Sequence, residues 1–347
     1  MGLCASSDVY FTNNPAHDTT CPEGALTVQP GLNSLTKAID ALISSVATDL
    51  SIGSDISYAQ YEQGSSQFPT YKGRDRHTYS MQRGKISQVN TDGTYDITPE
   101  TPNNLWNGVG DADEFREAHK CIKSVALKDI RNVTPKNGIT SLFLLNGVHD
   151  ENGEIIFIEF PLKIVGQNRD AVKIKAGLWI LGREGKDVHL SDCTVTGAKG
   201  NGIYAGTLVK CPGETSEERE AASILFGVHL KNVCVEKCGA GVCVDSTSGN
   251  TMTDCNVNNN TNYGVLAQSG ACMTIDGSAT TIHHNVGKRD KRANNYGLHA
   301  SGGSILLKSL KKEDISTKNG GGGNYTDTRR LVRVGKAWRQ TTTVKTI

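Results

Sequence analysis

The sequence lacks a strong net charge, long apolar runs and many bulky aromatic residues. Lys and Arg number 37 against 36 Asp and Glu, a balance that excludes a uniformly basic nucleic-acid coat or an acidic solvating tail. No run approaches the roughly 18 apolar residues of a transmembrane helix. Phe numbers only 7 whereas Gly reaches 38, a composition typical of a turn-rich β protein. The 347 residues allow two domains, or one elongated domain with appendages.

The N-terminus lacks a secretory signal, because no charged start leads into an apolar run. Met1–Ser6 instead matches the N-myristoylation pattern, with Gly2 as the acyl acceptor and Cys4 as a candidate for palmitoylation. Two acyl chains anchor a protein stably, while one chain binds membranes reversibly. We therefore expect a cytoplasmic protein that is peripheral on a membrane through lipidation of Gly2 and Cys4. A chance match to so short a pattern is the alternative.

The ten cysteines are expected to stay reduced if the protein is cytosolic. Cys234, Cys238 and Cys243 are closely spaced, but they lack the paired C-x2-C knuckles of structural zinc sites. Free cysteine otherwise behaves as a small buried hydrophobe. We interpret these three residues as core residues, and the sequence predicts no cofactor and no metal site.

Two amphipathic stripes predict helices ahead of the main repeat. Residues 33–50 carry apolar side chains at helical spacing, and Asn33 or Ser34 is the expected N-cap. Residues 111–126 carry a second stripe that opens with a capping box at Asp111. The second helix is expected to cap the repeat that follows it.

A hairpin signal lies between these two stripes. Ile86 and Val89 precede, and Tyr95 and Ile97 follow, an Asp-Gly turn at Asp92. The phrase resembles the first hairpin of an SH3-like or Tudor-like barrel. The later strands and the aromatic cage of such readers are not visible, so we predict a small β ornament without a binding function.

A sequence repeat begins near residue 189. Segments 189–195, 229–235 and 251–257 align in one register, and their shared turn position holds Asp192, Asn232 and Asp254. These turn residues are expected to be structural, with their side chains satisfying neighbouring backbone groups in a ladder. About ten residues later each unit has a glycine followed by alternating apolar residues, and these glycines are Gly202, Gly241, Gly264 and Gly297.

Short strands turned at a fixed period cannot each bury a face alone, but stacked they bury a continuous core. The repeat is too short for a βαβ unit and predicts an all-β fold, a parallel β-helix. We expect about seven coils between residues 178 and 319. Ile203, Val242, Val265 and Leu298 should form one interior row.

Residues 111–324 resemble the right-handed parallel β-helix proteins of the pectate-lyase-like superfamily. The resemblance rests on the capping helix, on Leu142–His149, on the run Ile158–Gly166 and on the repeated Gly-Ile-Tyr-Ala-type turns. More narrowly, the chain is similar to uncharacterised β-helix proteins of algae and their large DNA viruses, in which the last coil closes in a run like Gly320–Tyr325.

The sequence divides into four predicted regions. They are an irregular segment over 1–30, a small α/β region with a helix and the hairpin over 31–110, the parallel β-helix solenoid over 111–324, and a basic tail over 325–347.

Enzymes of the resembling superfamily are polysaccharide lyases and glycoside hydrolases. The R-x-P-x-x-R pattern of the lyases is absent. The hydrolase set of N-T-D, D-D, G-H-G and R-I-K is absent as a set, because only N-T-D occurs, at Asn90–Asp92 in the hairpin region. Asp245, Glu236 and Asp276 are single carboxylates near turns, without the paired spacing of a glycosidase. No catalytic residue is predicted.

Two histidines, His189 and His229, share one register on successive coils. Their side chains are expected to stack about 4.8 Å apart, an arrangement that suits a metal or a general base. Thr251 takes the same position on the third coil and breaks the row. The sequence therefore favours a solvated histidine pair over a site, and it favours a site at His283 and His284 even less.

The charges are unevenly distributed along the chain. Residues 286–347 hold 14 Lys and Arg against 4 Asp and Glu, a net of +10, while the first 110 residues hold 6 against 11, a net of −5. An anionic lipid surface or an acidic polymer is the expected partner of this basic end, with plain solubility as the alternative. Aromatic residues do not alternate with these basic residues, so the sequence does not indicate specific nucleic-acid binding. The candidate binding residues are Lys288, Arg289, Lys291, Arg292, Arg329, Arg330 and Arg333.

Three hypotheses follow for the function. The first is a non-catalytic structural or binding protein that presents a rigid β-helix face, either lipid-anchored or held by protein partners in a larger assembly. The second is a polysaccharide lyase or glycoside hydrolase with a divergent site, which rests on the fold alone. The third is a minor structural component of a large virus particle, with a virion location.

Overall fold

The protein is described by a computed structural model that divides into two compact units. The first unit comprises residues 1–38, 140–207 and 222–347, and the second comprises residues 39–139 and 208–221. The residues that the structure describes are 21–22, 24–46, 50–61, 71–72, 78–92, 94–99, 122–125, 141–158, 160–182, 187–207, 227–286, 295–326, 330–334, 337–341 and 344–346.

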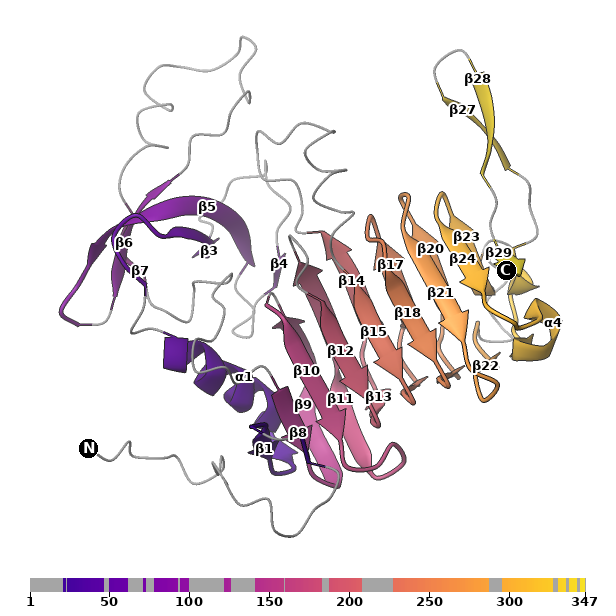
Figure 1. Ribbon diagram of the computed structural model, residues 1–347, viewed down its shortest axis with the longest axis horizontal. Helices are drawn as coiled ribbons and strands as arrows, with labels where there is room; N and C mark the ends of the chain where they lie inside the picture. Colours follow the sequence, from indigo (N-terminus) through magenta and orange to yellow (C-terminus); the bar gives the residue numbers. More distant parts are fainter. Residues whose placement is uncertain are drawn as a thin grey trace. The chain divides into compact units, whose positions relative to one another are not determined.

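The first unit is a solenoid-like stack of parallel strands (Figure 1). One wall, which we call sheet A, has nine strands among the described residues, in an order that follows the chain from one coil to the next. These strands are β1 (Leu26–Val28), β8 (Ser141–Leu144), β10 (Leu162–Gly166), β12 (Val188–Ser191), β15 (Val228–Lys231), β18 (Asn250–Thr253), β21 (Cys272–Asp276), β24 (Ser304–Leu307) and β29 (Val344–Thr346).

The second wall has two halves that two long strands, β9 (Gly147–Ile158) and β11 (Val172–Gly182), join. The start of β11 pairs with one half and its end pairs with the other, so each coil runs along three strand positions. One half contains β13 (Thr194–Thr196), β16 (Cys234–Glu236), β19 (Asn256–Asn258), β22 (Thr281–His283) and β25 (Ser316–Thr317). The other half contains β14 (Asn201–Thr207), β17 (Ala240–Asp245), β20 (Val265–Gln268), β23 (Tyr296–Ser301) and β26 (Gly323–Tyr325), while β2 (Gly31–Leu32) pairs with β9.

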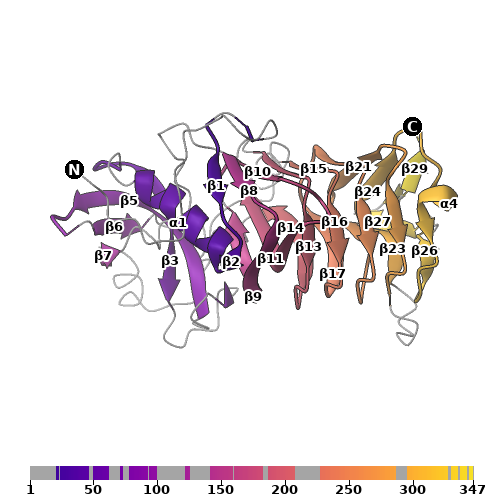
Figure 2. The same cartoon turned by 90° about the horizontal axis from the view of Figure 1, so that it is seen from below.

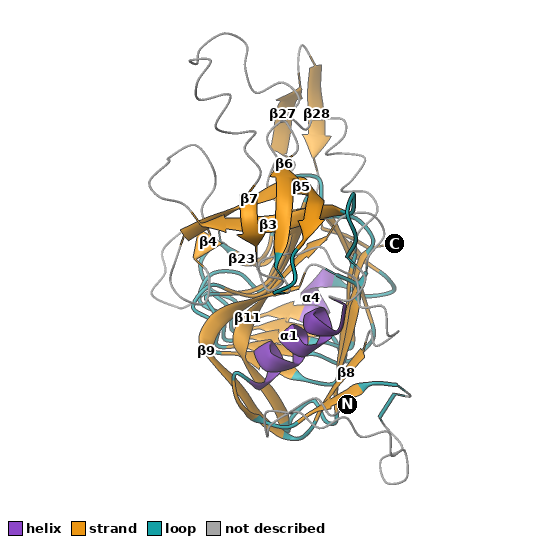
Figure 3. Ribbon diagram, turned by 90° about the vertical axis from the view of Figure 1, so that its left-hand side faces the viewer, coloured by secondary structure: helices purple, strands orange, loops and turns teal. Residues whose placement is uncertain are grey.

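Parallel pairing in constant register builds the core as rows of identical positions. Ile203, Val242, Val265 and Leu298 pair with one another in sequence and are at most 1% exposed, which confirms the predicted interior row. A second interior row runs along sheet A from Leu142 through Leu190 and Leu230 to Leu307. Figure 3 looks along this stack, with β8 on one side of the interior and β9 and β11 on the other.

The turns that follow β12, β15 and β18 lie at the same place in successive coils, and each has one residue with left-handed backbone. Asp192, Asn232 and Asp254 have φ of 55°, 53° and 53°, a conformation that Asn and Asp tolerate better than most residues. The Asn232 side-chain amide donates to Asp192 Oδ1 at 2.8 Å. This contact supports the expectation that the row is structural.

A longer ladder, which the sequence reasoning missed, lies at the turn after β19, β22 and β25. Asn260 donates to Asn285 Oδ1 at 2.9 Å, Asn285 donates to Asn319 Oδ1 at 3.1 Å, and the same amides reach backbone carbonyls of Val235 and Val257. Asn260 and Asn285 are at most 1% exposed. The ladder satisfies buried backbone groups that the turn takes out of the sheet.

Helix α1 (Ser34–Val46) confirms the first predicted helix, with its end four residues earlier than expected. Asn33 holds the N-cap position, since its carbonyl oxygen accepts the first helical hydrogen bond from Lys37 N–H at 2.9 Å. The first-turn amides of Leu35 and Thr36 donate to Glu151 Oε1, at 2.9 and 3.3 Å, so a distant side chain rather than Asn33 or Ser34 satisfies them. Ser34 Oγ contacts His149 Nδ1 at 2.8 Å, and both side chains are buried. The first turn of α1 is therefore fixed to β9.

The second predicted helix, over residues 111–126, is wrong where it can be checked. Ile122–Val125 form strand β7, which pairs with a neighbouring strand of the second unit, and the earlier residues lie outside the described part of the chain. Apolar spacing in a short segment does not distinguish a helix from a strand that packs against one face.

The extent of the solenoid also differs from the prediction. Between residues 178 and 319, sheet A has five described strands rather than seven, because inserts lengthen several coils. The parallel sheets extend beyond residues 111–324 at both ends, through β1 and β2 near the N-terminus and β29 near the C-terminus (Figure 2). The short helix α4 (Lys312–Ile315) lies before β25 in the last coil, and β27 (Arg330–Val334) pairs antiparallel with β28 (Ala337–Thr341).

The second unit contains an antiparallel sheet that includes the predicted hairpin. Its strands are β3 (Asp55–Tyr61), β4 (Tyr71–Lys72), β5 (Thr78–Val89), β6 (Tyr95–Pro99) and β7. Val89 pairs with Tyr95 and Ile86 pairs with Ile97 around the turn, which confirms the hairpin.

Among the described residues, no helix has the length and apolarity needed to cross a bilayer.

The interior row predicts the effect of a buried charge. Val265 is 0% exposed and stacks between Val242 and Leu298. We expect Val265→Asp to lower the free energy of unfolding by about 3–5 kcal/mol, or to prevent folding, because an unpaired carboxylate would be buried. Urea denaturation measures the change. Thr253→Asp places the same charge on the outer face of sheet A, and its free energy of unfolding should be close to that of the wild type. Equal decreases in the free energy of unfolding of both variants would show that our register is wrong.

The ladder predicts a second stability effect. Asn285→Ala should lower the free energy of unfolding by about 2–3 kcal/mol, because it leaves amide and carbonyl groups of two neighbouring coils buried without partners. Asn262→Ala, at a half-buried position outside the ladder, is the matched control and should change stability by less than about 1 kcal/mol. A loss no greater than that of the control would remove the ladder from the list of stabilising interactions.

Candidate functional site

The outer face of sheet A carries a row of polar side chains. Along β12, β15 and β18 the side chains alternate, so Leu190 and Leu230 point into the core while His189, His229 and Thr251 point outward. The imidazole rings of His189 and His229 stack with centroids 4.6 Å apart and planes inclined by 19°. The predicted histidine pair is therefore confirmed in register and spacing.

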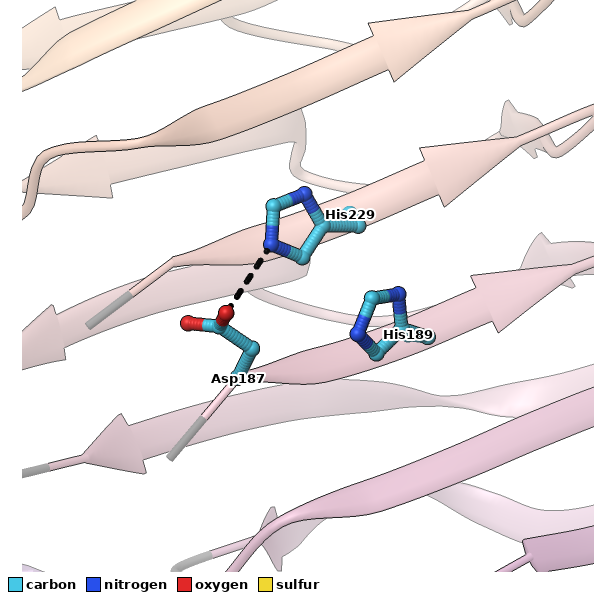
Figure 4. Close-up of side chains that lie close together, drawn as sticks. All are labelled: Asp187, His189 and His229. Carbon is cyan, nitrogen blue, oxygen red and sulfur yellow. Dashed lines mark ion pairs between the residues drawn. The ribbon is translucent and has the colours of Figure 1, made fainter. Parts of the chain in front are cut away.

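Two further residues hold His229 from opposite sides. Its Nε2 lies 3.4 Å from Asp187 Oδ2 (Figure 4). Its Nδ1 lies 2.8 Å from Thr251 Oγ1. The other carboxylate oxygen of Asp187 accepts the backbone N–H of Gly227 at 2.9 Å. Asp187 is thus tied to the strand that carries His229, although it precedes the strand of His189.

Sequence reasoning missed Asp187 and assigned Thr251 only the role of breaking the row. A signal existed, because Asp187 precedes His189 by two residues, and positions two apart on a strand share one face. The hydroxyl of Thr251 meets Nδ1 because the coils keep one register. The potential metal-binding atoms of Asp187, His189 and His229 all lie within 4.8 Å of one another.

The charges around His189 oppose each other. Partial burial lowers the pKa of His189 first, and the neighbouring His229 and Lys163 lower it further, while Asp187 raises it. Lys163 is exposed and pairs directly with His189 from the preceding coil. The site therefore favours a neutral His189, in which one ring nitrogen has a free lone pair to accept a proton or to bind a metal.

The other predicted site residues are dispersed or undescribed. The lipidation residues Gly2 and Cys4 lie outside the described residues, as do Lys288, Arg289, Lys291, Arg292 and Arg329. Arg330 and Arg333 lie on β27.

The three single carboxylates do not come together. Asp245 is on β17 and accepts hydrogen bonds from Tyr204 and Gln268, at 3.2 and 2.9 Å, Glu236 is on β16, and Asp276 is on β21. These strands belong to the three different strand positions of a coil.

The closely spaced cysteines are part of the core. Cys234, Cys238 and Cys243 are at most 8% exposed, and the seven described cysteines form no disulfide. Burial raises the pKa of Cys238 to about 11 and of Cys243 to about 12, so these thiols stay protonated at neutral pH. Within the described residues, none of them belongs to a cluster of three metal-binding groups.

Comparison with known proteins gives no match: no family model, no curated protein and no solved structure is similar to this chain. The functional argument therefore rests on the fold and on the side chains themselves.

The opposing charges around His189 predict two pKa changes of opposite sign. His229→Thr should raise the pKa of His189, because it removes the neighbouring imidazole that lowers this pKa. Thr is the residue that the next coil has at this position. Asp187→Asn should lower the pKa of His189, because it removes the one attraction for the imidazolium.

Proton NMR titration of the imidazole resonances, in buffer with a chelator, measures both changes. His283 serves as the internal control, because its pKa is lowered by burial and by His284 and Lys318, far along the chain from these substitutions. Shifts of the same sign in both variants would contradict the assignment of charges.

Proposed function

We propose that this protein is a non-catalytic binding protein, a right-handed parallel β-helix whose C-terminal end docks on an anionic membrane surface. The stack of parallel strands supports the fold. A strand-to-strand crossover in one parallel sheet is right-handed in nearly all proteins. The repeat of short coils in constant register agrees with the pectate-lyase-like superfamily.

The concentration of positive charge in the C-terminal segment of the chain carries the functional proposal. Strands β25, β26 and β29 are the last strands of the two parallel sheets, and they lie, together with β24, in the segment 286–347 with its net charge of +10. Lys308, Lys311 and Lys318 are exposed on this last coil. The basic residues therefore do not spread evenly over the solenoid, as they would if they served solubility alone.

A membrane suits this arrangement better than a soluble polyanion because a second attachment exists in the sequence. Acyl chains on Gly2 and Cys4 would supply the hydrophobic part of the interaction, and basic residues add about 1 kcal/mol each near an anionic surface. A single acyl chain binds marginally, so the basic end and the N-terminus would act together. The cytosolic leaflet, which carries anionic lipids, is the proposed location.

Co-sedimentation with lipid vesicles tests the basic end by itself. Full-length protein without acylation is mixed with phosphatidylcholine vesicles, with or without phosphatidylserine. We expect binding to the anionic vesicles only, and weaker binding as salt rises from about 0.1 to 1 M and the Debye length falls from about 10 to 3 Å. Replacing Lys288, Arg289, Lys291 and Arg292 with Ser should weaken binding more than about 100-fold.

A matched variant removes the same charge elsewhere. Lys163, Lys173, Lys199 and Lys231 are exposed on earlier coils, and their replacement by Ser should leave vesicle binding within a few-fold of the wild type. Equal losses in the two quadruple variants would mean that net charge rather than the C-terminal end drives binding. Equal affinity of the wild type for neutral and anionic vesicles would remove the proposal.

A further inference from the structure

The cluster on the outer face of sheet A is independent of the proposed membrane contact. From its geometry we infer that Asp187, His189 and His229 form a binding site for a divalent transition metal ion of the zinc class. Two imidazoles and a carboxylate are ligands that zinc accepts, and a site with three protein ligands leaves one position for water or for a group of a partner.

The distance between two of the ligand atoms already fits one metal ion. Zinc binds nitrogen and carboxylate oxygen at about 2.0–2.2 Å, so two ligands of a tetrahedral ion are roughly 3.4 Å apart. His229 Nε2 and Asp187 Oδ2 are 3.4 Å apart. The third group, His189, is exposed, and its ligand atom lies within 4.8 Å of the other two, so we expect rotation of its ring to complete the set.

Hydrogen bonds orient the two better-fixed ligands. The contact between His229 Nδ1 and Thr251 Oγ1 lets Nδ1–H donate to the hydroxyl, which leaves the lone pair of Nε2 directed toward Asp187. The Gly227 N–H occupies one carboxylate oxygen of Asp187 and leaves Oδ2 for the metal. Metal-binding histidines and carboxylates are usually held by such outer contacts.

The space beside His229 Nε2 depends on a glycine. A Cβ at Gly227 would lie 3.4 Å from Nε2 and 3.1 Å from the carbonyl oxygen of Gly249. A Cβ at this position would therefore touch the nitrogen that faces Asp187, and glycine leaves that space open. Lys163 is the opposing feature, because its charge next to His189 weakens the attraction for a cation without blocking the ligand atoms.

Titration of the chelator-treated full-length protein with zinc chloride, followed by calorimetry, tests the site. We expect one equivalent to bind, and expect His229→Ala and Asp187→Asn each to weaken binding more than tenfold. Thr251→Val keeps the shape of the side chain but removes the hydroxyl, and should weaken binding about 10-fold or more. Lys163→Met should strengthen it.

The second histidine pair provides the control. His283 and His284 have their Nδ1 atoms 2.8 Å apart on another coil, so His283→Ala removes an imidazole from a similar pair and should leave zinc binding unchanged. Cobalt substitution adds a spectroscopic test, since a site without thiolate gives visible bands without sulfur charge-transfer absorption. The inference would be overturned by any of four results. These are no zinc binding, zinc binding unchanged in both His229→Ala and Asp187→Asn, loss of zinc binding in His283→Ala, or a cobalt spectrum with thiolate absorption. None of these outcomes bears on vesicle binding, so the two proposals fail separately.

Discussion

The constant register between coils is the constraint on which the rest of the first unit depends. A single coil of short strands leaves its apolar side chains exposed toward the neighbouring coils. It gains stability only when the next coil places apolar side chains at the same positions. Ile203, Val242, Val265 and Leu298 satisfy this condition by pairing directly and excluding water. Turns must then occur at the same place in each coil, which requires left-handed backbone at Asp192, Asn232 and Asp254 and buried amide ladders where the chain leaves the sheet.

The same register determines the chemistry of the outer surface. Stacking places equal positions of successive coils about 4.8 Å apart, whatever residues they hold. Two histidines at one position therefore become a stacked pair, and the residue of the third coil becomes a hydrogen-bond partner rather than another ring. A carboxylate two residues earlier completes a three-group cluster on a rigid sheet. Sites built in this way need few residues, because the scaffold supplies their spacing.

Charge is distributed unevenly along the chain. The nearly neutral total conceals an acidic first third and a strongly basic C-terminal segment, and both parallel sheets of the first unit end in strands of that segment. The two proposals therefore concern different parts of the chain: the proposed membrane attraction acts at long range from the basic segment, while the proposed metal site depends on short-range contacts on earlier coils. The first turn of α1, fixed by buried Glu151 and His149, ties the segment near the N-terminus to β9.

The sequence by itself determined the parallel-strand fold, the interior row, the hairpin at Asp92 and the histidine pair, because each is a local pattern or a repeat of local patterns. It did not identify β7, because the apolar spacing of this segment fits a helix as well as a strand. The pairing with Tyr95 and Ile97, which makes it a strand, is a tertiary contact. It did not identify Glu151 as the cap of α1, since that contact joins residues more than 100 positions apart. The sequence shows Asn260, Asn285 and Asn319 as separate residues, and only the stacking of β19, β22 and β25 brings them together as a ladder. Asp187 became part of a site only when the stack brought it to His229. Tertiary structure decided these features because they depend on which coils become neighbours, and inserts of different length hide that information in the linear chain.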